Sequence, residues 1–321
     1  MPDAAPRSPR RALADWARLL RPHQWSKNLL LLVPPLGAHR LGPGVLVPAL
    51  LAVVAFSLAA SSAYVVNDLL DLASDRAHPV KSRRPLAAGA ISPAAALAVA
   101  AAALVVAFLL ALALPAPFAG ALAAYVAITV AYSLRLKRVP VLDVLVLASL
   151  YTLRILAGTL ATGVPTSSWL FTLAIFLFLS LALVKRTSEL RLMSGTRPQG
   201  VPSPSPRVGG ERAGERGEEL VAQGRGYTTA DLETLSMLGI ASGLLAVLVL
   251  ALYLASADVA RLYAHHERLW LLCPLALYWV SRLWLLARRG MVDEDPVLFA
   301  LTDRTSHLVG LGAALVVLAG R

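Results

Sequence analysis

Residues 45–75 read VLVPALLAVVAFSLAASSAYVVNDLLDLASD, an apolar stretch that leads directly into acidic and amide side chains. The apolar part is long enough to cross a hydrocarbon core, which takes roughly 20 such residues as a helix. The polar part places Asn67, Asp68, Asp71 and Asp75 at i, i+1, i+4 and i+8, so the three aspartates share one face if the segment stays helical. Oxygen ligands on one face suit Mg²⁺, and carboxylates at the edge of a bilayer indicate function because they are costly there.

The composition of the whole chain supports a membrane protein, because 57% of its 321 residues are hydrophobic. We predict an all-α integral membrane protein with nine transmembrane helices, several of which are apolar runs of full membrane length. The predicted spans are 27–39, 45–67, 93–114, 117–135, 139–161, 168–186, 233–256, 269–287 and 305–320. The first and last are short enough to be tilted or only partly inserted.

Basic residues gather in every second loop, and this pattern predicts the orientation of the chain. The formal net charge of +11 is explained by these loops, so no nucleic-acid partner is implied. The N-terminus is expected on the cytoplasmic side and the C-terminus outside. The basic side holds the N-terminus, Lys81/Arg83/Arg84, Arg135/Lys137/Arg138, the segment 185–232 and Arg288/Arg289.

The domain organisation that we predict is simple. Residues 1–26 form a cytoplasmic or interfacial segment, in which Ala12–Leu20 is predicted to be an amphipathic helix, and residues 27–321 form one membrane domain. Within that domain, 193–226 is rich in Pro, Gly and Ser and is predicted to be a disordered cytoplasmic loop. The one cysteine, Cys273, excludes a disulfide or a cysteine-based metal site within the chain.

Basic side chains that follow the acids are candidates for binding phosphate. Lys81 and Arg84 lie within twenty residues of Asn67, and lysine and arginine bind phosphate oxygens directly. Acids for a metal and bases for phosphate together are what a diphosphate substrate requires. The alternative is a solvated loop with ordinary cytoplasmic charges, and the aspartate spacing favours function over it.

Further candidates lie beside other predicted spans. Some of them also have a purely structural interpretation. Tyr132 would serve as an interfacial anchor, and Lys185 and Glu189 would form an i,i+4 ion pair. Asp143 and Arg154 lie within the fifth predicted span, about 16 Å apart along a helix, too far to pair with each other. The additional phosphate-binding candidates are Lys27, Asn28, Tyr132, Lys137, Lys185 and Arg186. For the acids Asp293, Asp295 and Asp303 no role is predicted beyond an ion pair or a cavity lid.

These motifs resemble the UbiA superfamily of intramembrane prenyltransferases, whose first aspartate-rich signature is matched by Asn67, Asp68, Asp71 and Asp75. The resemblance implies nine transmembrane helices around a central cavity, with Mg²⁺ and a diphosphate bound at the cytoplasmic side. The decaprenyl-phosphate phosphoribosyltransferase branch is most similar. That similarity rests on 21–28, 75–85, 132–137 and 185–189, which read RPHQWSKN, DRAHPVKSRRP, YSLRLK and KRTSE.

The resemblance to that branch implies a reaction in which a lipid phosphate attacks C1 of 5-phosphoribosyl diphosphate and diphosphate leaves. Asp68, Asp71 and Asp75 would be the catalytic acids, and with Asn67 they would form the Mg²⁺ site. Diphosphate or ribose 5-phosphate would be bound by Lys81, Arg84, Tyr132 and Lys137, and the second phosphate by Lys27, Lys185 and Arg186. The implied partners are polyprenyl phosphate, phosphoribosyl diphosphate and the bilayer of a bacterial-type plasma membrane.

Two other functions remain open at this stage. An aromatic prenyltransferase would share the metal–diphosphate site, but its superfamily relatives carry a second aspartate-rich motif where this chain has Lys185, Arg186 and Glu189. A transporter of lipid or solute without chemistry would account for Asp143 and Arg154, although metal-spaced acids favour an enzyme. The lipid chain length and the oligomeric state do not follow from the sequence.

Overall fold

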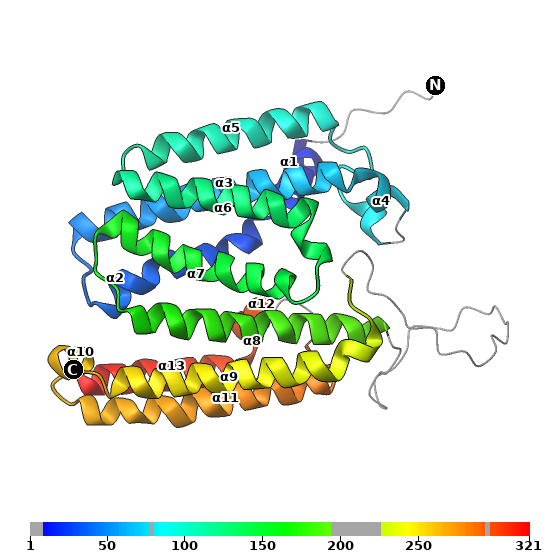
Figure 1. The fold of residues 1–321 in the computed structure, drawn as a ribbon. Helices are drawn as coiled ribbons and strands as arrows, with labels where there is room; N and C mark the ends of the chain where they lie inside the picture. Colours follow the sequence, from blue (N-terminus) through cyan, green and yellow to red (C-terminus); the bar gives the residue numbers. More distant parts are fainter. Residues whose placement is uncertain (1–8, 78–79, 194–225, 293–295) are drawn as a thin grey trace, which may run out of the picture. The chain divides into compact units, whose positions relative to one another are not determined.

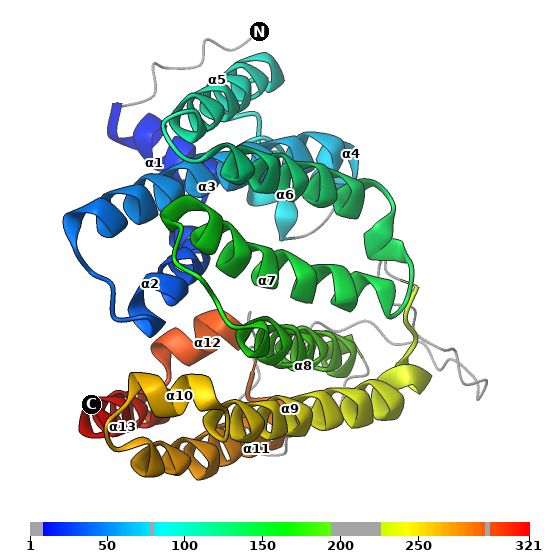
Figure 2. The ribbon, with the colours of Figure 1, turned by 60° about the vertical axis from the view of Figure 1, so that its left-hand side comes forward.

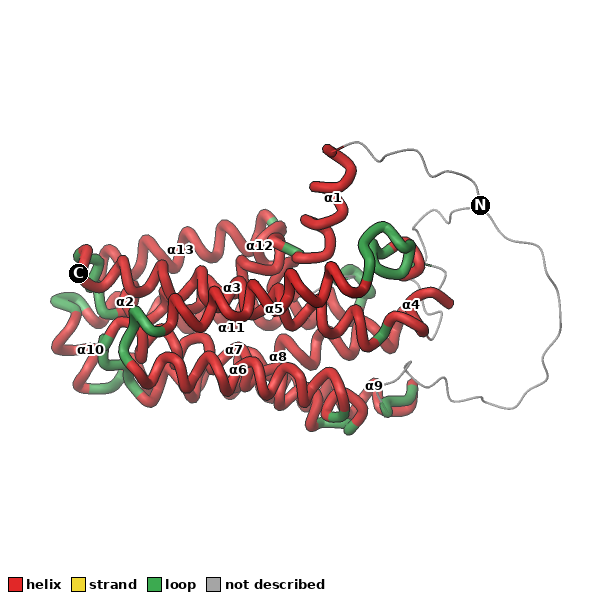
Figure 3. The backbone as a smooth tube through the Cα atoms, turned by 90° about the horizontal axis from the view of Figure 1, so that it is seen from above, coloured by secondary structure: helices red, strands yellow, loops and turns green. Residues whose placement is uncertain are grey.

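The computed structural model describes residues 9–77, 80–193, 226–292 and 296–321, and every regular element in these ranges is a helix (Figures 1 and 3). The chain divides into two compact units. The first comprises residues 1–134 and 150–166, and the second comprises 135–149 and 167–321. Helix α7 (Leu142–Thr162) contributes its first residues to the second unit and the rest to the first.

The first unit is organised around α3 (Pro43–Leu70), which packs against its neighbours α1, α5, α6 and η1. Ribbon views show α5 and α6 running along α3 (Figures 1 and 2). The other elements of this unit are α1 (Pro9–Leu20), η1 (Pro22–Leu32), α2 (Val33–Gly37), α4 (Leu72–Ala77), η2 (Lys81–Arg83), α5 (Pro93–Ala111) and α6 (Ala116–Leu134).

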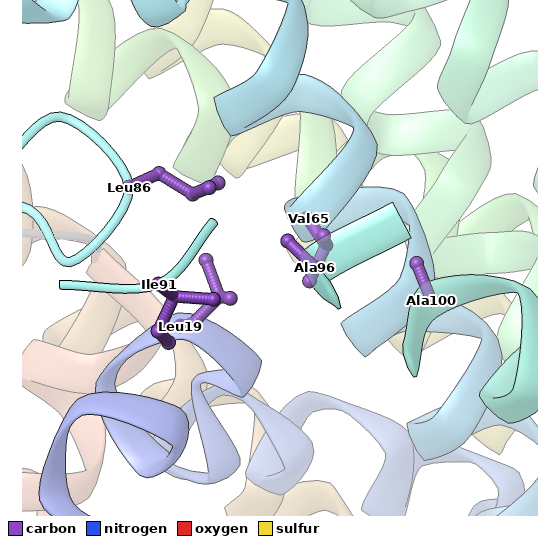
Figure 4. Close-up of a cluster of buried hydrophobic side chains, with 6 residues drawn as sticks. All are labelled: Leu19, Val65, Leu86, Ile91, Ala96 and Ala100. Carbon is purple, nitrogen blue, oxygen red and sulfur yellow. The ribbon is translucent and has the colours of Figure 1, made fainter. Parts of the chain in front are cut away.

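A small apolar cluster fastens the amphipathic helix α1 to the end of α3. Leu19 of α1 is fully buried with Val65 of α3, and Leu86 and Ile91 come from the loop between η2 and α5 (Figure 4). Burying a leucine side chain is worth about 2 kcal/mol, so this cluster holds the neighbouring polar residues in fixed positions.

The segment η1 enters the first unit as a 3₁₀-helix that runs antiparallel to α3. Trp25 donates to Ser61 (3.0 Å), and Asn28, further along η1, donates to Ser57 (3.0 Å), further back along α3. On its other side η1 approaches α7 at Gly158, where a Cβ atom would lie 2.2 Å from the carbonyl oxygen of Leu31. A glycine is therefore needed at this contact.

The second unit is a set of helices in which α8 (Ser168–Met193) packs along α9 (Leu232–Leu254), and α11 (Leu272–Arg288) contacts both (Figure 2). Gly239 lets α9 lie close to α11, because a Cβ there would lie 2.1 Å from the Trp284 ring. The remaining elements are η3 (Leu136–Arg138), η4 (Thr229–Asp231), α10 (Ala257–Leu262), η5 (His266–Leu271), α12 (Pro296–Thr302) and α13 (Arg304–Gly320).

Within the described ranges, seven helices are long and apolar enough to cross a membrane, and they correspond to seven of the nine predicted spans. The first predicted span, 27–39, is divided between η1 and α2, and the last, 305–320, is the 17-residue helix α13. The predicted loop at 193–226 lies outside the described residues except at its two ends. Asp293 and Asp295 also lie outside them.

Candidate active site

Two arginines bind the aspartates at the end of α3 in the first unit. Arg21 Nη2 donates to both carboxylate oxygens of Asp68, at 2.6 and 2.8 Å. Arg84 Nη1 donates to Asp68 Oδ1 at 3.0 Å and to Asp75 Oδ2 at 2.7 Å. We call Asn67, Asp68, Asp71, Asp75, Arg21 and Arg84 the acid–arginine cluster. Both Asp68 and Asp75 are buried, whereas the arginine side chains are 23% and 32% exposed.

The local chain explains why these charges meet. Arg21 follows the last residue of α1 and has a left-handed backbone (φ 53°), while Arg84 lies two residues before Leu86. Leu19 and Leu86 both belong to the apolar cluster around Val65, which is one helical turn before Asp68. The buried leucines therefore deliver the two guanidinium groups to the same carboxylate.

The aspartates themselves do not lie on one uninterrupted helix. Helix α3 ends at Leu70 and α4 begins at Leu72, with Asp71 between them. The helical hydrogen bonds nevertheless continue, because Asp71 N donates to Asn67 O (2.9 Å) and Asp75 N donates to Asp71 O (2.8 Å). The spacing predicted for a helix is therefore largely kept. Asp68 and Asp75 share Arg84, and Asn67 Nδ2 donates to Asp71 Oδ2 at 3.1 Å.

The donor set fits a magnesium ion that is bound together with a phosphate substrate. Asn67 and Asp71 are half-buried neighbours with hard oxygen atoms. Across the described residues, no three or more acid, histidine or cysteine side chains form a ready-made metal site. Mg²⁺ is usually held by one or two carboxylates plus substrate phosphates and water, which these residues can provide.

A second polar network in the first unit surrounds Arg154, which is buried within α7. Its guanidinium donates to Asn28 Oδ1 (2.9 Å), Leu150 O (2.7 Å) and the Tyr125 hydroxyl (3.1 Å). The ring of Tyr151 lies beside Arg154 and also beside Lys27, whose Nζ is 5.7 Å from the ring centroid. Asn28 is fully buried between Ser57 and Arg154, so its amide positions η1.

A third cluster lies in the second unit, where Asp143 is completely buried. It accepts hydrogen bonds from Arg186 Nε and from the Tyr227 hydroxyl, both at 2.5 Å. Arg186 also pairs with Glu189, and Val141 N donates to the Tyr227 oxygen at 2.7 Å. Burial, and then the hydrogen bond to Asp143, raise the pKa of the Tyr227 hydroxyl, so it stays protonated and keeps donating.

The remaining predicted phosphate-binding residues are divided between the units. Tyr132 and the exposed Lys81 belong to the first unit, and Lys137 and Lys185, both half-buried, belong to the second. The structure thus brings together Asn67, Asp68, Asp71, Asp75 and Arg84 in one cluster. Arg186 belongs to a different cluster, in which it pairs with the carboxylates of Asp143 and Glu189.

Sequence reasoning gave no role to two residues that hold these clusters together. Arg21 is in a motif that we noted, but its contact with Asp68 spans 47 positions. Tyr227 follows the Pro- and Gly-rich segment directly and meets Asp143 across 84 positions. The periodicity of a helix predicts contacts only between residues a few positions apart, so it does not predict these pairs. The signal available for Arg21 was its place beside Lys27 and Asn28 in one basic and polar motif.

The family follows from comparison with known proteins. The model of the UbiA prenyltransferase family matches residues 36–301. A solved structure of a UbiA homolog from Archaeoglobus fulgidus, bound to DMAPP and Mg²⁺, superimposes with a TM-score of 0.66 at 19% identity, covering 95% of this chain and 97% of that one. The chain belongs to the UbiA prenyltransferase family and is an integral membrane transferase with the UbiA fold.

Curated relatives cover the chain to different extents. The uncharacterized protein y4nM of Sinorhizobium fredii is 37% identical over 92% of this chain, which spans about half (54%) of that relative. Nodulation protein NoeC of Azorhizobium caulinodans is 33% identical over 92% of this chain and 89% of its own length. Decaprenyl-phosphate phosphoribosyltransferase of Mycolicibacterium smegmatis is 37% identical over 61% of this chain and 62% of its own length.

Proposed function

We propose that this transferase moves a 5-phosphoribosyl group from phosphoribosyl diphosphate to a polyprenyl phosphate and releases diphosphate, with Mg²⁺ as cofactor. The observation that carries the proposal is the acid–arginine cluster, in which carboxylates and guanidinium groups are interleaved at the end of α3. A metal–diphosphate complex carries the positive charge of the metal and the negative charge of the phosphates. It therefore needs carboxylates for the metal and cationic side chains for the phosphates.

The choice of a sugar donor over a prenyl donor rests on two supports. The mycobacterial relative at 37% identity is a decaprenyl-phosphate phosphoribosyltransferase. In addition, the segment after the sixth predicted span carries Lys185 in place of a second set of aspartates, beside Arg186, whose charge is paired with Asp143 and Glu189. A lysine at this position favours an anionic acceptor such as a lipid phosphate over an uncharged aromatic ring.

Each residue receives a role in this proposal. Asn67, Asp71 and Asp75 hold Mg²⁺, which supplies neutralisation of the leaving diphosphate. Asp68 orients Arg21 and Arg84 through the ion pairs described above. Lys81, Arg84, Tyr132 and Lys137 bind the donor, and Lys27 and Lys185 bind the acceptor phosphate, while Asn28 and Arg186 position their neighbours.

A phosphate monoester is already ionised at neutral pH, so the acceptor needs no strong general base. The side chains of the protein therefore act by binding and orienting two anions whose mutual repulsion would otherwise keep them apart. Holding two reactants in an attacking geometry lowers the barrier by about 7–11 kcal/mol in the most favourable cases. Excluding water protects the activated sugar from hydrolysis.

The proposal includes nine spans, a cytoplasmic N-terminus and a site that faces the cytoplasm of a bacterial-type inner membrane. Counted from residue 27, η1 and α2 extend about 20 Å, since a 3₁₀-helix rises about 2.0 Å and an α-helix about 1.5 Å per residue, so this first span is short for a hydrocarbon core of about 30 Å. The 17 residues of α13 extend about 26 Å. Residues 1–26 then form the interfacial segment and 27–321 the membrane domain.

The direct test is transfer of radiolabelled phosphoribose to polyprenyl phosphate by the purified full chain, with and without Mg²⁺. We expect a lipid-linked phosphopentose that depends on Mg²⁺. Asp71→Asn should lower turnover by about a hundredfold or more, a loss typical of removing a group that stabilises a transition state electrostatically. Asp15→Asn, which changes a carboxylate on α1 paired with Arg18, is the matched control and should retain turnover.

Two results would contradict the proposal. Product formed only from a prenyl diphosphate and an aromatic acid would replace the sugar donor with a prenyl donor. Near-normal turnover by a folded Asp71→Asn variant would remove the metal role from the cluster.

A further inference from the structure

One guanidinium nitrogen serves two carboxylates in the acid–arginine cluster. Arg84 Nη1 lies 3.0 Å from Asp68 Oδ1 and 2.7 Å from Asp75 Oδ2. The two aspartates are buried, whereas the Arg84 side chain is 32% exposed. The cation is thus the exposed partner of this group, and the acids are its buried partners.

The two aspartates differ in what they keep if Arg84 turns away. Asp68 retains Arg21, which contacts both of its oxygens. Among the described residues, the side-chain partner recorded for Asp75 is Arg84 alone. Leaving a buried carboxylate uncompensated is costly, so another cation has to replace Arg84 at Asp75 when Arg84 leaves.

We infer that Arg84 is an exchangeable counter-ion: it neutralises Asp75 until a divalent cation arrives with a diphosphate, and it then turns from Asp75 to the diphosphate. The inference rests on the metal–diphosphate part of the proposed function and does not depend on which group the diphosphate carries. Arg84 is suited to both partners, because a guanidinium binds carboxylate and phosphate oxygens with the same planar fork.

The exchange has a consequence for the order of binding. A bare divalent cation has to compete with the positive charge of Arg84 for Asp75, and it gains nothing in return. A cation that arrives with diphosphate brings negative charge that Arg84 can bind. Arg84 therefore weakens binding of the metal alone and strengthens binding of the metal–diphosphate complex, which couples the two ligands.

The test measures Mn²⁺ binding to the purified full chain by electron paramagnetic resonance, first alone and then with inorganic diphosphate. Arg84→Gln removes the competing charge, so it should bind Mn²⁺ alone about tenfold more tightly, the size expected for one charge near a divalent ion in a water-like medium. The same variant should bind Mn²⁺ with diphosphate about tenfold more weakly. Arg83→Gln, an equal charge change at an exposed neighbour, should alter neither affinity by more than about twofold.

Arg84→Lys provides a second variant that keeps the charge and so protects the test against misfolding. It should bind Mn²⁺ alone like the unmodified protein and bind the diphosphate complex more weakly, because lysine lacks the planar fork. Thermal unfolding of every variant checks that the fold is retained.

Specific outcomes would overturn the inference. Weaker or unchanged binding of Mn²⁺ alone to Arg84→Gln would show that Arg84 does not compete with the metal. Tighter binding of Mn²⁺ alone to Arg84→Lys would show that the competition does not come from the positive charge at this position. If diphosphate does not strengthen Mn²⁺ binding to the unmodified protein and Asp71→Asn behaves identically, the proposed function fails with it. If Asp71→Asn does abolish binding while Arg84→Gln behaves like the unmodified protein, the proposed function stands and the exchange alone is refuted.

Discussion

The two units each hold an arginine against a buried aspartate, but they differ in how much water reaches the cation. In the first unit Asp68 is bound by Arg21 and Arg84, whose side chains are 23% and 32% exposed. In the second unit Asp143 and Arg186 are 0% and 2% exposed, and Tyr227 closes the other side of the carboxylate. We call the part-exposed pairing of Asp68 with Arg21 and Arg84 the open pair. We call the buried pairing of Asp143 with Arg186 the closed pair.

An ion pair is therefore not by itself evidence for a ligand site. A part-exposed guanidinium can change partners because water screens the charges during the exchange. A fully buried pair cannot separate without leaving a desolvated charge behind, so it holds structure. We therefore assign ligand exchange to Arg84, and we expect Arg186 to fix the end of α8 while Lys185 beside it meets a phosphate.

The largest effect is expected from breaking the closed pair. Asp143→Asn preserves the shape of the side chain but leaves Arg186 with less compensation in a buried place. Removing one partner of a buried pair costs about 3–5 kcal/mol, so the free energy of unfolding should fall by that amount. Denaturant unfolding of the purified protein measures it. A loss below about 1 kcal/mol would show that the closed pair is not structural.

The same substitution in the open pair should cost less. Asp68→Asn leaves Arg21 and Arg84 able to reach water, and Arg84 keeps its bond to Asp75. We expect a loss of about 2 kcal/mol in the free energy of unfolding, in the range for hydrogen bonds to charged groups. A loss equal to or greater than that of Asp143→Asn, measured in the same detergent, would show that the exposure of the arginine does not set the stability of these ion pairs.

A smaller change tests the hydrogen bond from Tyr227 to Asp143 in the closed pair. Tyr227→Phe removes the hydroxyl that donates to Asp143 and should lower the free energy of unfolding by about 1.5 kcal/mol, at the lower end of the range for hydrogen bonds to charged groups. Since burial and the Asp143 hydrogen bond raise the pKa of Tyr227, the difference should stay constant from neutral to mildly alkaline pH. Tyr278→Phe on the exposed side of α11 is the control and should have no effect. Equal stability of both variants would exclude Tyr227 from the cluster.

The smallest effect is expected from a third pair, Arg282 and Asp303, in which the arginine is about as exposed as Arg21 and the aspartate is more exposed than Asp68. Arg282 binds both oxygens of Asp303, which caps α13 by accepting from Ser306 N. These bonds, chiefly those from Arg282, lower the pKa of Asp303 to about 2 from its ordinary 3.8. A lowered pKa gives stability above the ordinary value that is lost as the pH falls from about 4 towards 2.

Asp303→Asn should therefore reduce the acid dependence of the melting temperature in that pH window and lower stability slightly above it. Melting curves of the two proteins across acidic pH measure the difference. Parallel acid profiles would show that Arg282 does not hold Asp303 ionised.

Much of the fold was predictable because membrane helices are local features of the chain. An apolar run of sufficient length forms a helix in a bilayer whatever the rest of the protein does, since its backbone groups have no water to bind. Seven predicted spans meet this criterion of length and composition among the described residues. The first span could not be predicted in detail, because an 11-residue 3₁₀-helix leaves no mark in hydropathy.

The membrane helices, the family and the spacing of Asn67, Asp71 and Asp75 could be read from the amino-acid order alone, because each depends on neighbours a few positions apart. Which arginine contacts which aspartate, and how exposed each pair is to water, depends on the folded arrangement of the chain. Arg21 and Arg84 share a carboxylate because buried leucines far apart in the chain pack together. The aspartate that an arginine contacts, and the burial of the pair, both arise from packing between distant segments. These two properties distinguish an arginine that can exchange its carboxylate for a ligand from one that cannot.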